Sequence, residues 1–308
     1  MAPFNTGRGE NFQSDKPDYK EFFDGEMKNY FVEGETMRVY ISADIEGVSG
    51  VVHGEHTARD GREHDYARML MTEEVNACVL GALEVGAEKV VVNDSHGTMR
   101  NIYHEKLHTK AELILGTPKK LAMMEGISSD FDAVLFVGYH TRMGTAGILN
   151  HTFNGRVVRA VKINGMEFGE LGLNALIAGH FDVPVVFVSG CNLVAIEAEE
   201  CIPDIHQAIV KQTINRTTAL NVHPVTAREL IKEGTKKALL HREEIKPFTM
   251  KAPYILEMEF LHTGLADAVE ILPIVKRTGP LMISFVTSDI LECYQLIRSS
   301  IMIAGSVS

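Results

Sequence analysis

Short runs of apolar, mostly β-branched residues recur along the chain from Met37 onward. Because these runs are almost continuously apolar, they are typical of strands buried on both faces of a mostly parallel sheet. The four clearest runs are VYISAD (39 to 44), KVVVND (89 to 94), AVLFVGY (133 to 139) and PVVFVSG (184 to 190). The pattern therefore predicts an α/β fold.

The segments between these strands predict the connections that a parallel sheet needs. Residues 72 to 87 predict an amphipathic helix with Thr72 as its N-cap, which gives a strand, helix, strand crossover unit. Residues 156 to 168 alternate around Asn164-Gly165, a strong hairpin signal, and residues 169 to 181 predict a helix. We expect a three-layer α/β/α fold with a mostly parallel central sheet and an antiparallel hairpin excursion.

The N-terminal residues predict an extension outside the domain, whereas the C-terminal third predicts further helices and strands. Residues 1 to 36 are polar and mixed in charge, so we expect an N-terminal extension ahead of one domain over 37 to 308. The many aromatic residues of this extension indicate that part of it packs on a neighbouring segment or on another subunit. The C-terminal third predicts helices at 226 to 241 and 289 to 303, and strands at 254 to 260 and 281 to 288. These elements fit either an edge of the same sheet or a small second lobe from about residue 222.

The composition and charge of the chain indicate which kinds of binding partner and which cellular location to expect. The chain has 308 residues, a formal net charge of −11 and 45% hydrophobic residues, which is typical of a globular protein and opposes binding to nucleic acid. It shows no membrane-spanning stretch and no export signal, and its four cysteines form no CxxC pair, so we expect a cytoplasmic protein without disulfides or membrane contact. The sequence contains neither of the glycine-rich motifs that bind nucleotide phosphates, nor the G-x-S-x-G motif that carries a serine nucleophile.

Side chains that bind metals follow three of the predicted strands. Asp44 and Glu46 follow the first strand, His96 the second and His140 the third. Because parallel strands end at one edge of a sheet, we expect these side chains to meet there. In an extended chain the side chains of Asp44 and Glu46 point to the same face. Two carboxylates this close repel each other unless a cation lies between them. Each residue alone fits an ordinary structural role, but together they form a ligand set typical of zinc.

Two further residues lie near this edge in the sequence. His151 follows a glycine-rich connection after His140, which can carry it back over the same edge. Glu170 stands at the predicted start of a helix, where an acidic residue also stabilises the helix dipole. The residue pattern alone leaves the role of both open.

A competing motif is His104-Glu105-Lys106-Leu107-His108, which fits the H-E-x-x-H pattern of zinc proteases. Its flanks allow a helix of barely two turns before a strand-like run, so we rank a surface turn first for these residues. A metalloprotease that uses His104 and His108 remains an alternative function. A non-catalytic α/β module that binds a small ligand at its strand ends is another.

Five motifs occur in one order along the chain. They are S-x-D-x-E-G (Ser42 to Gly47), MTEE (Met71 to Glu74), VNDSH (Val92 to His96), GYH (Gly138 to His140) and GELGLNA (Gly169 to Ala175). In this order they resemble the D-aminopeptidase family of dinuclear zinc peptidases. The resemblance runs from about Met37 to the C-terminus.

The resemblance implies a metal site, an active-site histidine and an assembly. The implied zinc ligands are Asp44, Glu46, His96, His140 and Glu170, and the active-site histidine is His151. The implied activity is hydrolysis of short peptides, with D-residues at the N-terminus as the named preference of the family and L-peptides as an open possibility. The implied assembly is a ring-shaped homo-oligomer, a decamer, whose active sites face an internal chamber.

Five ligands are too many for one tetrahedral zinc with an open position, so we expect two Zn2+ per subunit that share a carboxylate. A metal-activated water would then attack the scissile carbonyl. His151 suits proton delivery or oxyanion stabilisation better than nucleophilic attack, because an acyl-imidazole offers little advantage beside an activated water.

Overall fold

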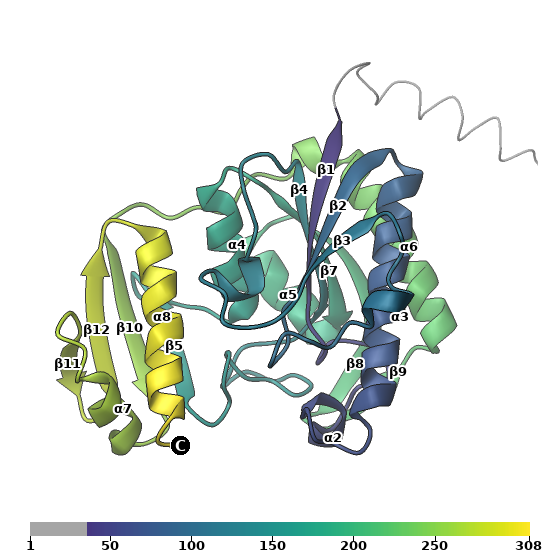
Figure 1. The fold of residues 1–308 in the computed structure, drawn as a ribbon. Helices are drawn as coiled ribbons and strands as arrows, with labels where there is room; N and C mark the ends of the chain where they lie inside the picture. The colour runs from purple at the N-terminus through teal and green to yellow at the C-terminus, as the bar shows by residue number, and fades with distance from the viewer. Residues whose placement is uncertain (1–35) are drawn as a thin grey trace, which may run out of the picture. The chain divides into compact units, whose positions relative to one another are not determined.

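A seven-stranded sheet, called sheet A here, lies at the centre of the computed structural model, which describes residues 36 to 308 (Figure 1). Its order is β3-β2-β1-β4-β7-β8-β9, and all neighbouring pairs are parallel except β8 and β9. The strands are β1 (Met37–Ala43), β2 (Ala87–Asp94), β3 (Ala111–Ile114), β4 (Ala133–Tyr139), β7 (Val185–Cys191), β8 (His206–Asn215) and β9 (Thr218–Asn221). The expected mostly parallel sheet is confirmed, while the packing predicted for the aromatic residues of the N-terminal extension lies outside the described residues.

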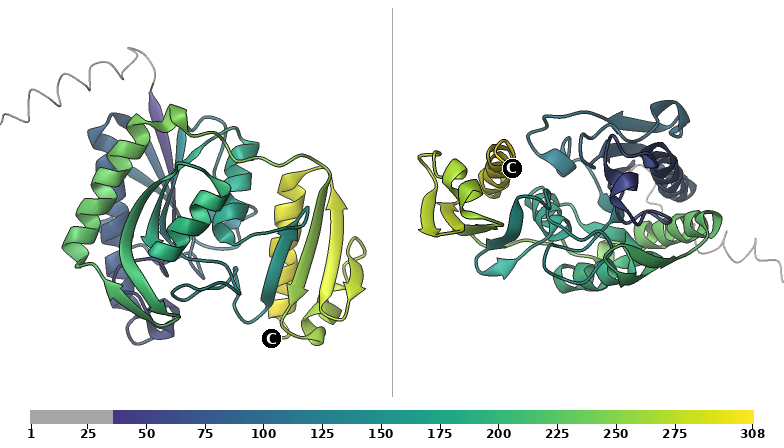
Figure 2. Two further views of the ribbon diagram at one scale, coloured as in Figure 1. Left: turned by 180° about the vertical axis from the view of Figure 1, so that it is seen from behind. Right: turned by 90° about the horizontal axis from the view of Figure 1, so that it is seen from below.

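Helices cover both faces of sheet A, as expected for a three-layer fold (Figure 2). Helices α3 (His64–Glu84) and α6 (Pro224–Leu240) pack against each other on one face, and α4 (Glu170–His180) and α5 (Asn192–Cys201) cover the other. All residues of β4 and β7 are buried as a result, which explains why their sequences are continuously apolar.

The predicted start of the first long helix is wrong. Helix α3 begins at His64, so Thr72 lies inside the helix and is buried. Its hydroxyl donates to the carbonyl oxygen of Arg68, one turn earlier, and accepts from the backbone N–H of Tyr103. Thr72 followed by two glutamates mimics a helix N-terminus, but the buried Ala67 and Leu70 extend the apolar face by two turns before it.

The hairpin around Asn164-Gly165 is confirmed and belongs to a second sheet, called sheet B here. Asn164 has a φ of 53° and Gly165 a φ of 81°, as a tight hairpin turn requires. Sheet B is antiparallel with the order β11-β12-β10-β5-β6. Its strands are β5 (Val158–Ile163), β6 (Met166–Glu167), β10 (Tyr254–Phe260), β11 (Lys276–Gly279) and β12 (Met282–Thr287). The strands predicted at 254 to 260 and 281 to 288 thus belong to sheet B with the hairpin and not to the edge of sheet A.

Two helices belong to sheet B, α7 (Thr263–Val269) and α8 (Ile290–Gly305). Helix α8 packs on β10 and β12 and also contacts α4, which covers sheet A. One face of α8 therefore lies next to the elements that carry the candidate site (Figure 1).

The remaining helical segments are short. They are α2 (Gly54–Thr57) and the 3-10 turns η1 (His104–Lys106), η2 (Ala122–Met124) and η3 (Arg242–Glu244). Among residues 36 to 308, no helix combines the length and the apolar character that crossing a membrane requires.

Candidate metal centre

The carboxyl ends of three adjacent strands bring the predicted ligands together. The order β2-β1-β4 places the residues that follow these strands side by side. The backbone N–H of Asp44 donates to the carbonyl oxygen of Val137 at 2.8 Å, and that of Ser95 donates to Ala43 at 2.8 Å. These bonds extend the pairing just beyond the ends of the strands. Asp44, His96 and His140 therefore meet at one edge of sheet A, as the sequence predicts.

The turn after β1 depends on a glycine. The N–H of Gly47 donates to the carbonyl oxygen of Gly138 at 2.7 Å, and a Cβ built on Gly47 would lie 2.1 Å from the carbonyl oxygen of Tyr139. A larger residue at this position would push the turn away from β4. Gly47 thus allows Asp44 and Glu46 to approach His140.

Among the residues that the structure describes, two groups of side chains have ligand atoms close enough to hold an ion each. The first is Asp44, Glu46 and His96, and the second is His140, His151 and Glu170; within each group the ligand atoms lie within 4.8 Å of one another. In the first group, His96 Nδ1 lies 3.0 Å from Glu46 Oε2 and 3.2 Å from Asp44 Oδ1.

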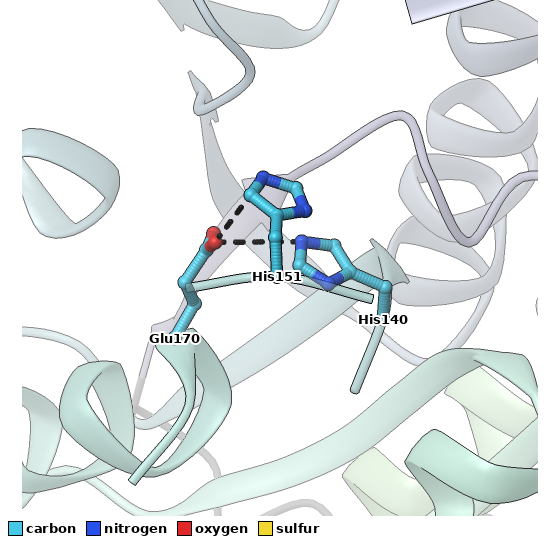
Figure 3. A group of neighbouring side chains, drawn as sticks. All are labelled: His140, His151 and Glu170. Atoms are coloured by element: carbon cyan, nitrogen blue, oxygen red, sulfur yellow. Dashed lines mark ion pairs between the residues drawn. The ribbon is translucent and has the colours of Figure 1, made fainter. Parts of the chain in front are cut away.

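The second group is drawn in Figure 3. Glu170 Oε1 lies 3.4 Å from His140 Nε2 and 3.7 Å from His151 Nε2. His140 Nε2 also lies 3.4 Å from Asp44 Oδ2. One oxygen of Asp44 thus faces the first group and the other faces the second. This is the position that a carboxylate shared by two metals occupies.

Backbone carbonyl oxygens fix the orientation of the three imidazoles. The pairs are His96 Nε2 with Thr57 at 2.9 Å, His140 Nδ1 with Thr141 at 3.0 Å, and His151 Nδ1 with Leu149 at 2.9 Å. A ring nitrogen next to a carbonyl oxygen carries the hydrogen, so the opposite nitrogen of each neutral ring is the one that offers a lone pair. In all three rings that opposite nitrogen faces the carboxylates, which is the arrangement typical of histidines that bind metals.

Two buried atoms of the cluster, Glu46 Oε2 and His140 Nε2, have ion-pair contacts but no hydrogen-bond partner. Both belong to residues whose side chains are about 95% or more buried. A buried polar atom without a partner is costly, and coordination of a cation removes that cost. Oxygen and nitrogen donors in two adjoining groups fit two zinc ions.

The electrostatics of the cluster are those of closely packed ion pairs. Burial raises the pKa of Asp44, but the neighbouring imidazoles of His140 and His96 outweigh it and hold this pKa well below its ordinary value. Burial lowers the pKa of His140, but Glu170 and Asp44 outweigh it and raise this pKa well above 6.5. Without a metal, protons on the imidazoles balance the carboxylates. Divalent cations that replace these protons restore the neutral imidazoles that ligation requires.

Lys211, which none of the predicted ligand motifs includes, supports the turn that carries Glu46. It is fully buried, and its Nζ donates to three backbone carbonyl oxygens, those of Glu46 at 2.6 Å, Val48 at 2.8 Å and Val51 at 2.6 Å. Lysine is rarely buried without a specific role. In the sequence, the only sign of this burial is that Lys211 directly follows the apolar run Ala208 to Val210.

Asp94 supports the loop that follows the second strand through the hydrogen bonds of its carboxylate. Its carboxylate accepts from the backbone N–H groups of Asn101 and Ile102 at 2.5 and 2.7 Å, and from the side-chain amide of Asn101. The same amide donates to the carbonyl oxygen of His96. Asp94 therefore shapes the loop that presents His96.

The loop that carries His151 has an unusual backbone. Leu149 and Phe153, two residues before and after His151, have φ values of 51° and 56°, in the left-handed region that these residue types avoid. Such conformations persist where the surroundings hold them, and they concentrate at functional sites. Here the N–H of Phe153 donates to Glu170 Oε1 at 2.6 Å, which ties the loop to a predicted ligand.

The H-E-x-x-H alternative is not favoured by the geometry. His104 begins the three-residue turn η1, and Leu107 after it is extended, so His104 and His108 do not share one turn of an α-helix. His104 and Glu105 are exposed. Within residues 36 to 308, neither candidate group of metal ligands includes these residues.

Comparisons with known proteins agree on one family. The family model described as D-aminopeptidase matches residues 37–299. The D-aminopeptidase of Bacillus subtilis (strain 168) is 40% identical over 260 residues, which cover 84% of this chain and 94% of that protein. A solved structure, described as the Zn-dependent D-aminopeptidase DppA from Bacillus subtilis, a self-compartmentalizing protease, is 39% identical with a TM-score of 0.85. The match covers 87% of this chain and 98% of that one.

Proposed function

Because the chain belongs to the D-aminopeptidase family, we propose that it is a zinc-dependent aminopeptidase that hydrolyses short peptides, with D-residues at the N-terminus as preferred substrates. One observation carries this proposal. Asp44 contacts both groups of ligand atoms, and each group contains a buried atom with no hydrogen-bond partner.

The two candidate groups of ligands support a proposal of two ions per chain. Glu46 and His96 would hold one ion, His140 and Glu170 would hold the other, and Asp44 would contribute an oxygen to each. Bound Zn2+ supplies a Lewis acid and a water-derived nucleophile at neutral pH, which peptide hydrolysis needs. The protein itself excludes bulk water from the ligands, because the side chains of Asp44, His140 and Glu170 are 6% exposed or less.

The surroundings of His151 support a role as a proton donor or an electrostatic stabiliser. Its Nδ1 is held by the carbonyl oxygen of Leu149, so its Nε2 points toward the cluster. Its side chain is 18% exposed, against 1% for His140, so it is the more accessible of the two rings to a substrate. Protonated at Nε2, it can donate to a developing oxyanion or to the leaving amine.

The assembly belongs to the same proposal. The similar Bacillus subtilis structure is described as a self-compartmentalizing protease. We infer that this chain also forms a ring-shaped homo-oligomer, a decamer, in the cytoplasm, with its sites facing an inner chamber. Light scattering coupled to size-exclusion chromatography measures the mass directly, and a monomer at micromolar concentration would contradict the inference.

Purified protein and a small panel of peptides test the function. We expect zinc in the purified protein and faster release of the N-terminal residue from D-alanyl peptides than from matched L-alanyl peptides. Removal of zinc by a chelator should abolish hydrolysis, and added zinc should restore it. A protein without bound zinc that cleaves neither series would instead support a module that binds small ligands.

A further inference from the structure

The metal ligands open into a small cavity that also receives a side chain from the second sheet. This cavity has a volume of about 80 Å³, and Asp44, His96, His151 and Glu170 line it. Arg298 of α8 lines it as well. Because α8 packs on sheet B, the cavity combines metal ligands from sheet A with a cationic group from a different layer of the fold.

The guanidinium of Arg298 is held in place without being neutralised. Its Cζ lies 4.7 Å from the centre of the Phe153 ring. Within residues 36 to 308 it forms no hydrogen bond and no ion pair, and the side chain is only half-buried. A guanidinium that stacks on an aromatic face keeps its N–H donors in the plane of the group, where they remain available to an anion.

A short series of contacts fixes the ring under Arg298 relative to the metal ligands. The N–H of Phe153 donates to Glu170 Oε1, and the Phe153 ring packs edge to face on Tyr294, with centroids 6.0 Å apart. The hydroxyl of Tyr294 donates to Asn174 Oδ1 at 2.8 Å. The Phe153 ring that contacts Arg298 is therefore held in place, and the backbone of Phe153 is hydrogen-bonded to the predicted ligand Glu170. An arginine on a flexible part of the surface would lack this support.

The charges around the cavity indicate what Arg298 binds. The other ionisable groups that line it are the carboxylates and imidazoles of the metal cluster. A short peptide with neutral side chains carries one anionic group, its C-terminal carboxylate, and a guanidinium binds a carboxylate through two parallel hydrogen bonds. We propose that Arg298 binds the C-terminal carboxylate of the substrate and so selects very short peptides with a free carboxyl end. This inference rests on the proposed aminopeptidase function.

A comparison of peptide acids with peptide amides tests the role of Arg298. For the wild type we expect kcat/KM for D-alanyl-D-alanine to exceed that for D-alanyl-D-alaninamide by at least about tenfold, because a hydrogen bond to a charged group contributes about 1.5 to 3 kcal/mol. In Arg298→Met, KM for the acid should rise by about 10 to 100 fold, and the preference for the acid should disappear. The matched control is the exposed Arg62→Met, which should keep the preference.

A binding measurement separates this inference from the proposed function. The probe is the dipeptide analogue in which CH2–NH replaces the peptide bond, used as its acid and its amide in calorimetric titrations of the zinc-loaded protein. If Arg298 binds the carboxylate, the wild type binds the acid more tightly and Arg298→Met binds both equally. Equal losses for acid and amide, or a wild type that does not distinguish them, would overturn the inference. A wild type that distinguishes the two but cleaves no peptide would overturn the aminopeptidase function alone.

Discussion

The imidazole rings of His140 and His151 are stacked, with centroids 4.3 Å apart and an angle of 8° between their planes. Both Nε2 atoms face Glu170 Oε1, but only His140 Nε2 also lies 3.4 Å from Asp44. His140 thus contacts the carboxylates of both Asp44 and Glu170, while the more exposed His151 contacts only that of Glu170. On the basis of this difference we propose that His140 is a metal ligand and that His151 transfers protons.

The first prediction concerns His151. Replacement of His151 by Ala should lower kcat by about two to four orders of magnitude, because it removes a general acid or oxyanion donor, and should leave the bound zinc unchanged. Kinetics and elemental analysis on the same preparation measure both quantities. His104→Ala is the control and should keep full activity and zinc. Loss of zinc from His151→Ala would move His151 into the ligand set.

The second prediction concerns Asp44. Because its two oxygens face different groups, Asp44→Ala should deplete both ions and abolish activity. Glu46→Gln should weaken only the ion that Glu46 shares with His96. Zinc content per chain after gel filtration distinguishes the two variants. An Asp44→Ala protein that keeps its metal and its activity would discredit the cluster as the active site.

The third prediction concerns Lys211. Lys211→Met leaves three buried carbonyl oxygens without their donor, so it should destabilise the protein by about 2 to 4 kcal/mol and weaken zinc binding through the Glu46 turn. Thermal unfolding and zinc titration measure these effects. Lys232→Met is the matched control, because Lys232 forms only a partly exposed ion pair with Glu84 and should change stability by less than about 1 kcal/mol. Similar losses in both variants would rule out the supporting role of Lys211.

The fourth prediction is a dependence on pH that arises from Glu74. Burial raises the pKa of Glu74 to about 7, although the N–H of Ser49 and the charge of Lys211 act in the opposite direction. The folded protein therefore holds the Glu74 proton more tightly than the unfolded chain does. The stability that comes from this proton is complete below the ordinary pKa of 4.5 and is lost as the pH rises toward 7.

Glu74→Gln removes this titration and keeps the shape of the side chain. The melting temperature of the variant relative to the wild type should therefore increase between pH 5 and pH 8. Melting curves of both proteins at the two pH values provide the measurement. A constant difference, or one of opposite sign, would show that the wild-type carboxyl does not titrate in this range.

The sequence predicts that the candidate ligands lie close together because parallel strands end at one edge of a sheet. Once three apolar runs are recognised as neighbours, Asp44, His96 and His140 must lie close together, whatever the details of the helices. Glu170 and His151 are different, because their approach depends on the left-handed backbone of the loop between them, which no periodicity indicates. Their assignment came from the family resemblance.

Other features depend on partners that are distant in the sequence. The pairing of β5 with β10 joins residues about 95 positions apart, for example Lys162 with Glu257, and the alternation in each strand does not identify its neighbour. The same holds for Arg298, whose position beside Phe153 follows from the packing of α8. Sequence patterns identify elements, whereas contacts between elements depend on the complete fold.

Anomalous diffraction at the zinc absorption edge, from crystals of the purified protein, tests the dinuclear site most directly. We expect two zinc peaks separated by about 3.5 to 4 Å, with Asp44 in contact with both, Glu46 and His96 beside one, and His140 and Glu170 beside the other. A single peak, or zinc bound at His104 and His108, would contradict the dinuclear centre.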